Sequence, residues 1–158
     1  KDLGEALKCY RRAADQGDAD AQFLLGWRYA KGDSVPKDPV ESVKWFRKAA
    51  VQGHAGAQNA LGVAFARGDG VVKDDCEAAR WYRKAAEQGD TYAQSNLGHC
   101  YANGNGVTKD YVAAYKWFNL AAARGKENAK ASRDALEKRM TRTQIADAQS
   151  LSRNFKAR

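Results

Sequence analysis

The sequence has 158 residues, 44% of them hydrophobic, and a net charge of +8. This hydrophobic content is enough for a folded core, which argues against a disordered chain, and no apolar run reaches the 18 residues of a membrane-spanning helix. The net charge invites a nucleic-acid interpretation, but residues 126–158 alone carry nine Lys/Arg against four Asp/Glu, so most of the excess lies at one end.

Three cysteines, Cys9, Cys76 and Cys100, bear on the compartment. Their number is odd and no CxxC spacing occurs, so they predict neither a disulfide framework nor a zinc site. They favour a reducing compartment over an exported one. Because the sequence starts at Lys1 and not at methionine, its lack of a targeting segment does not decide between the cytoplasm and a periplasmic or exported location.

Residues 1–18 predict a single helix, the second helix of a truncated repeat. Its small residues recur 36 positions later, with Ala13, Ala14 and Gly17 matching Ala49, Ala50 and Gly53. The first helix of this repeat is missing, so we expect the native protein to continue upstream with at least that helix. The stacking face left open at this end also predicts possible self-association.

Three full repeats follow, at residues 19–54, 55–90 and 91–126. Their constant columns include Ala21/Ala57/Ala93, Gln22/Gln58/Gln94, Leu25/Leu61/Leu97, Gly26/Gly62/Gly98, Gly32/Gly68/Gly104, Trp45/Trp81/Trp117 and Gly53/Gly89/Gly125. Self-similarity at a fixed period of 36 residues is typical of solenoids. In these folds, stacked neighbouring repeats form the hydrophobic core that one helix pair cannot form alone. The sequence therefore predicts an all-α solenoid of helix-turn-helix repeats, forming one domain over residues 1–158.

In the first full repeat, the first helix is predicted to span residues 20–31, with equivalents in the other two repeats. Apolar residues recur there at helical spacing, and the mid-helix Gly26, which costs about 1 kcal/mol relative to alanine, indicates a close helix–helix approach. We expect Gly32 to end this helix and Asp38 to cap the next one.

The second helix is predicted over residues 39–52. Val43, Phe46, Ala49 and Ala50 form one stripe with Trp45 beside it. We interpret the tryptophan and aromatic columns as core packing between helices, not as a binding site.

Residues 127–158 predict a degenerate repeat followed by a C-terminal capping helix. Arg133 and Asp134 replace the Leu-Gly pair of the repeats, and Thr141 with Gln144 fits a capping box. The apolar faces expected here are Ala135/Leu136/Met140 and, in the last helix, Ile145/Ala148/Leu151/Phe155. Such a polar-backed end would cover the last apolar face of a solenoid.

These columns resemble the Sel-one-like repeat (SLR), a variant of the tetratricopeptide class. The resemblance rests on A-x-Q-x-x-L-G-x-x-Y/F-x-x-G, then V-x-K-D, then W-aromatic-x-x-A-A-x-x-G, and covers residues 3–125. The last segment is similar to tails that close bacterial members. The resemblance implies a right-handed α–α superhelix and a scaffold or adaptor that binds a protein or peptide. The cysteine pairs of some exported members are absent.

By analogy with tetratricopeptide geometry, the partner would bind a concave groove lined by the first helices. Positions flanking the Leu-Gly pair differ between repeats, as a surface that selects a partner would. The candidate residues are Phe23, Trp27, Lys31, Asn59, Arg67, Asn96, His99 and Asn103. Trp27 is the expected anchor, the basic residues would pair with carboxylates, and the asparagines would bond a peptide backbone.

Two alternatives of other classes remain open at this point. The basic C-terminal tail could bind nucleic acid or an anionic surface, although the mixed charges elsewhere do not favour it. Ser34 and Lys37 spell S-x-x-K, as in enzymes that act on the cell wall or on β-lactams, but the two companion motifs are missing. We therefore expect no enzyme activity, no cofactor and no metal site.

Overall fold

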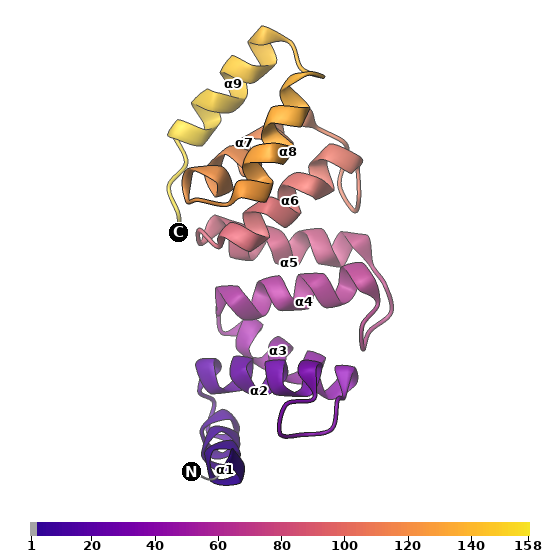
Figure 1. Cartoon of the computed structure of the whole chain (residues 1–158), viewed down its shortest axis with the longest axis vertical. Coiled ribbons are helices and arrows are strands. Elements are labelled where there is room, and N and C mark those ends of the chain that lie inside the picture. Colours follow the sequence, from indigo (N-terminus) through magenta and orange to yellow (C-terminus); the bar gives the residue numbers. More distant parts are fainter. Residues whose placement is uncertain (1–2) are drawn as a thin grey trace. The chain divides into compact units, whose positions relative to one another are not determined.

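The computed structural model describes residues 3–158, with side chains from Ala6 onward. Within this part the regular elements are all helices (Figure 1): α1 Leu3–Asp15, α2 Ala19–Lys31, α3 Pro39–Val51, α4 Ala55–Arg67, α5 Asp75–Glu87, α6 Thr91–Asn103, α7 Tyr111–Ala123, α8 Glu127–Glu137 and α9 Arg142–Arg153. The prediction of an all-α chain is confirmed. Residue 1, where the predicted truncated repeat begins, and residue 2 lie outside the described residues.

The helices form two compact units, which we call the N-terminal unit (residues up to Asp74) and the C-terminal unit (Asp75–Arg158). In the N-terminal unit, α1 packs on α2, α2 on α3 and α3 on α4. In the C-terminal unit, α5 packs on α6 and α6 on α7, and α7 contacts both α8 and α9 (Figure 1). No helix in residues 3–158 has the length and apolar character needed to cross a bilayer. The assignment of the whole chain to one domain stays a prediction.

The predicted ends of the helices are confirmed in the first full repeat. Gly32 has a left-handed φ of 75°, and its N–H donates to the carbonyl of Arg28, which closes the last turn of α2. The side chain of Asp38 accepts from the N–H of Glu41 at 3.0 Å and so caps α3. Both devices satisfy backbone groups that a helix end leaves without partners.

The mid-helix glycines admit an aromatic ring. A Cβ added to Gly26 would lie 2.6 Å from the ring of Phe46, and one added to Gly98 would lie 2.7 Å from the ring of Phe118. In each case the ring belongs to the second helix of the same repeat. The close approach inferred from the recurrence of this glycine is confirmed, and the recurring aromatic of the second helix is what it accommodates.

The recurring glutamine ties each repeat to the helix before it. Gln22 donates through Nε2 to the carbonyl of Ala14 at 3.0 Å, and the equivalent bonds run from Gln58 to Ala50 at 3.1 Å and from Gln94 to Ala86 at 3.2 Å. All three glutamines are buried, with at most 5% of each residue exposed. The bond adds a second donor to a carbonyl near the C-terminal end of the preceding helix, which already accepts from the N–H of the glycine that follows it, Gly17, Gly53 or Gly89.

Two loop glycines allow the loop after a first helix to touch backbone. A Cβ on Gly70 would lie 2.2 Å from the carbonyl oxygen of Pro39, and one on Gly106 would lie 1.9 Å from that of Asp75. Both glycines have positive φ. Ser34 stands in the same column of the first full repeat, exposed and with a φ of 63°. The serine of the S-x-x-K match is thus the left-handed position of a repeat loop.

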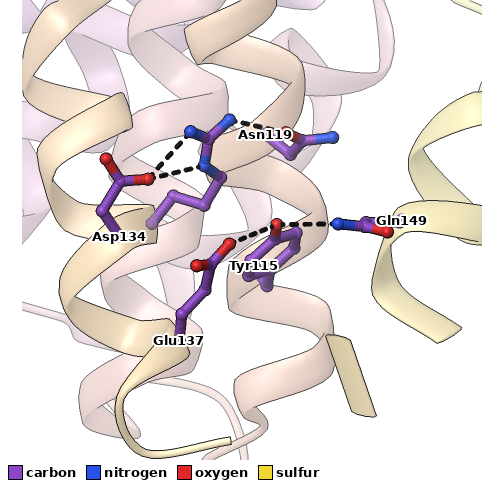
Figure 2. Close-up of polar contacts among 6 residues, drawn as sticks. Tyr115, Asn119, Asp134, Glu137 and Gln149 are labelled. Carbon is purple, nitrogen blue, oxygen red and sulfur yellow. Dashed lines mark hydrogen bonds and ion pairs between the residues drawn. The ribbon is translucent and has the colours of Figure 1, made fainter. Parts of the chain in front are cut away.

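The C-terminal cap is joined to α7 by polar contacts as well as by apolar packing (Figure 2). The hydroxyl of Tyr115 donates to Glu137 of α8 at 2.8 Å and accepts from Gln149 of α9 at 3.4 Å. Arg133 bonds Asp134 at 2.8 Å and Asn119 at 3.0 Å. The two residues that replace the Leu-Gly pair therefore pair with each other, and Arg133 reaches back to α7.

The predicted faces of the cap are partly wrong. The capping box of Thr141 and Gln144 is confirmed, and Ala148 is buried. However, Leu151 is 48% exposed, and Ser152 lies buried in its place with its hydroxyl on the carbonyl of Ala148. The inward face of α9 is formed by Ile145, Ala148 and Ser152, at positions i, i+3 and i+7, as the helical period of 3.6 residues requires.

Three other apolar residues of the cap also depart from the expectation. Ala135 is exposed although Leu136 beside it is buried, and Met140 lies beyond the end of α8. Phe155 lies beyond α9, where its ring packs edge-on against Trp117 at 5.5 Å. Only one side of α8 meets α7, so adjacent apolar residues cannot both be buried there.

The three thiols differ in exposure and should differ in reactivity. Cys9 and Cys76 are exposed, whereas Cys100 is 8% exposed, and its burial, with a smaller effect of Asp75, raises the pKa of its thiol to about 11.

At pH 8 we expect iodoacetamide to alkylate Cys100 roughly a hundredfold more slowly than an ordinary exposed thiol, because the thiolate is the reactive form. Peptide mass spectrometry after timed labelling measures this. In denaturant all three should react alike, and rapid native labelling of Cys100 would contradict the assignment.

Candidate functional site

The predicted groove residues of α2 lie at the edge of an aromatic cluster in the N-terminal unit. The ring of Trp27 lies edge-on to Phe23 at 6.2 Å and to Phe46 at 6.0 Å, and Trp27 remains 41% exposed. The ammonium of Lys31 lies 5.5 Å from the centre of the Trp27 ring. The structure thus brings together three of the predicted residues: Phe23, Trp27 and Lys31.

The two predicted residues of α4 take different positions. Asn59 is half-buried and Arg67 is exposed in the last turn of the helix. Among the described residues, no ring contact, hydrogen bond or ion pair joins Arg67 to the aromatic cluster. The shared site expected for Arg67 and Trp27 therefore stays a prediction.

His54 is a constituent of this cluster that the sequence analysis did not select. Its Nδ1 accepts from the N–H of Ala57 at 3.0 Å, which caps α4, and its Nε2 lies 3.2 Å from a carboxylate oxygen of Asp20. Its ring lies 4.5 Å from that of Phe23. The signal was available, because the equivalent caps of the other full repeats are aspartates, Asp18 and Asp90.

The C-terminal unit contains the other three predicted residues, all on α6. Asn96 is half-buried, while His99 and Asn103 are exposed. One side of the His99 ring packs against Phe118 at 4.8 Å, and this burial lowers the pKa of the imidazole. The lowered pKa favours the neutral imidazole, which offers a hydrogen-bond donor and an acceptor instead of a charge.

Tyr92 lies on the same helix, four residues before Asn96, and was not predicted. It is 60% exposed, and the ammonium of Lys126 lies 3.2 Å from the centre of its ring. The corresponding positions, Asp20 and Gly56, carry no aromatic ring, so the repeat pattern gave no reason to select it. The exposed residues of α6 are thus aromatic and polar, whereas those of α2 combine the apolar Leu24 and Trp27 with the charged Asp20 and Lys31.

A second unpredicted feature is an open pocket of about 840 Å³ in the C-terminal unit. It is lined by Arg83 of α5, Tyr101 of α6, residues 107–111 and Gln144 of α9. Arg83 donates to the hydroxyl of Tyr101. The repeat pattern predicts Arg83 and Tyr101 on repeat helices, residues 107–110 in a loop and Gln144 in the cap, and no motif connects residues so far apart in the chain.

The structure also locates the residues behind the two alternatives. The C-terminal tail folds back on its own unit, where the N–H of Arg158 donates to the carbonyl of Glu87 at 2.9 Å. The hydroxyl of Ser34 donates to Asp33 at 3.1 Å, and no hydrogen bond joins Ser34 to Lys37 in the described chain. In residues 3–158 no three His, Cys, Asp or Glu side chains are grouped as a metal site would require.

Comparison with known proteins gives a consistent result. The protein-family model described as Sel1 repeat matches residues 1–18, 19–54, 55–90 and 91–126. No curated protein matches the sequence. Among solved structures, the chain is similar to a Sel1 repeat protein from Oxalobacter formigenes, with 42% identity and a TM-score of 0.76 over 82% of this chain and 98% of that one.

It is also similar to a protective antigen of uropathogenic Escherichia coli strains that displays an SLR fold. The two share 35% identity with a TM-score of 0.72 over 98% of this chain, which spans 41% of the length of the antigen.

Proposed function

Because the chain belongs to the Sel1-repeat family of all-α solenoids, we propose that it is a non-catalytic scaffold that binds a peptide or protein segment on its first helices. Proteins of this family are generally protein-interaction scaffolds. The proposal extends that general role to a surface and to a kind of ligand.

The observation that carries the proposal is the exposure of Trp27. A tryptophan that is 41% exposed leaves much apolar surface in water, and Leu24, one turn away on α2, is 42% exposed. The contacts with Phe23 and Phe46 fix the ring, so a partner would lose little side-chain entropy in ordering it. Exposed, rigid aromatic residues of this kind are frequent hot spots of protein interfaces.

The neighbouring residues indicate the chemistry of the ligand. An apolar side chain of the partner would cover Trp27 and Leu24, and Lys31 beside them would pair with a carboxylate. In the same proposal Asn59 and Arg67 extend the site along α4 of the N-terminal unit, and Asn96, His99 and Asn103 of α6 are a second set of groups, in the C-terminal unit, that bond a peptide backbone. No chemical step is required of any of these residues.

The experiment is selection of peptides on the intact chain, followed by affinity measurement for the selected sequences. We expect Trp27→Ala to weaken binding at least tenfold, since losing a hot spot costs about 2 kcal/mol or more. Val51→Ala is the matched control, because Val51 is 70% exposed on α3 and outside the proposed surface. Failure to enrich any peptide, or equal affinity in Trp27→Ala and wild type, would contradict the proposal.

A further inference from the structure

The pocket of the C-terminal unit shares no lining residue with the proposed surface and differs from it in chemistry. Two cationic side chains, Arg83 and Lys109, line it, and a third, Arg139, lies 5.5 Å from the ring centre of Tyr111, another lining residue. None of these three is in an ion pair with any described residue. Unpaired cations around one hollow create a local positive potential that attracts anions.

The hydroxyl and amide groups of the pocket are also arranged to donate. The hydroxyl of Tyr101 accepts a hydrogen bond from Arg83, so its own proton is available to another acceptor. Gln144 uses its side-chain oxygen to accept from the N–H of Thr141, which leaves its NH2 group free to donate. Thr108 adds an exposed hydroxyl. The pocket therefore offers donors from three helices and a loop.

One acid lies in the lining, and its charge is already engaged. Asp110 accepts from the N–H of Ala113 at 3.0 Å as the N-cap of α7. A carboxylate in that position is stabilised by the positive end of the helix dipole, which offsets part of its field in the pocket. Of the net charge of +8, +6 belongs to residues 75–158, so the surroundings add to the positive potential.

The preceding repeat provides an internal comparison. Thirty-six residues earlier, the two lining cations have equivalents in Arg47 and Lys73, but Tyr101, Thr108 and Tyr111 correspond to Phe65, Val72 and Asp75. Arg47 lies over the ring of Phe65 much as Arg83 lies over Tyr101, at 5.6 Å and 5.8 Å. The cations are thus common to both repeats, and the hydroxyl donors are particular to the third.

We propose that this pocket binds an acidic peptide segment, with carboxylates of the segment paired to Arg83 and Lys109 and hydrogen-bonded by Tyr101 and Gln144. Arginine binds carboxylates through two parallel hydrogen bonds, and Arg83 retains donors for this after its bond to Tyr101. The pocket is wide and open to solvent, which suits an extended chain with several charges. This site shares no residue with the surface centred on Trp27.

The test uses fluorescein-labelled hexaglutamate as the probe and fluorescence anisotropy at 50 mM and 150 mM NaCl. We expect the intact chain to bind hexaglutamate, more weakly at the higher salt concentration, and not to bind labelled hexaglutamine. Arg83→Gln combined with Lys109→Gln should weaken binding at least tenfold. The matched control, Arg47→Gln combined with Lys73→Gln, should change it less than twofold.

Other variants and a competitor separate this proposal from its rivals. Tyr101→Phe keeps the ring and should weaken binding about threefold, whereas Trp27→Ala should leave it unchanged even if the proposed function fails. Equal losses in the two double variants would show a diffuse charge effect and overturn the proposal. Displacement of the probe by micromolar inorganic phosphate or pyrophosphate would also overturn it, since the ligand would then be a phosphate. Circular dichroism verifies that each variant is folded.

Discussion

Replacing Gly106 with alanine is expected to destabilise the C-terminal unit by roughly 3 kcal/mol. The residue has a φ of 68°, which costs an alanine about 1 kcal/mol. In addition, the new Cβ would lie 1.9 Å from the carbonyl oxygen of Asp75, so the loop or the start of α5 must move. Forcing atoms into packed structure costs a further 1–3 kcal/mol or so. Urea unfolding followed by circular dichroism measures the loss.

Gly125→Ala is the matched control for this prediction. Gly125 has a φ of 84°, but a Cβ there would meet nothing within 4 Å. Its replacement should therefore cost only the conformational part, about 1 kcal/mol. If the two variants lose equal stability, then the contact between the loop and Asp75 contributes nothing and our account of the glycine column is wrong.

Truncating Phe118 to alanine should cost about 3–5 kcal/mol, the range for a fully buried phenylalanine. Phe118 is 1% exposed, belongs to the core that α7 forms with α8 and α9, and fills the space left by Gly98. Since whole domains are stable by only about 5–15 kcal/mol, this single change should bring the unit near unfolding. Urea unfolding, with hydrogen exchange of α6 and α7 amides, measures the effect.

A less buried ring of the same unit tests whether burial causes the loss of stability expected for Phe118→Ala. Phe155→Ala removes a half-buried ring that packs on Trp117 and should cost less than half as much. In a folded Phe118→Ala protein, the pKa of His99 should also rise toward its ordinary value, because the ring that buries it is gone. A loss below 1.5 kcal/mol, estimated by the same rule, would contradict the assigned core position.

Most of the fold was predictable because the chain repeats. One helix boundary, glycine or cap recognised at one position could be tested at two others, and Gly26 was assigned to a close helix approach on that ground alone. The cap occurs once and lacks this redundancy. There the choice between Leu151 and Ser152 depends on the rotation of one helix, which a short apolar pattern does not fix.

The candidate sites were less predictable, for a physical reason. Trp27 was selected because its column varies; it is 41% exposed, and its role in binding stays a prediction. The substitution of His54 for a capping aspartate was visible in the repeat pattern, but its contacts with Asp20 and Phe23 appear only in the structure. The pocket depends on Arg83, Tyr101 and Gln144, whose proximity is set by the packing of the C-terminal unit.

The glutamine bond has a consequence for how such chains can change. Each buried Gln22, Gln58 or Gln94 side chain recognises a main-chain oxygen, which every amino acid possesses. This hydrogen bond between a repeat and the preceding helix can therefore form whichever residue supplies the carbonyl. A repeat transplanted from a different member of the family would supply its own glutamine donor, and the preceding helix would supply a backbone carbonyl as acceptor. Duplication and exchange of whole repeats therefore need no compensating substitution at this bond.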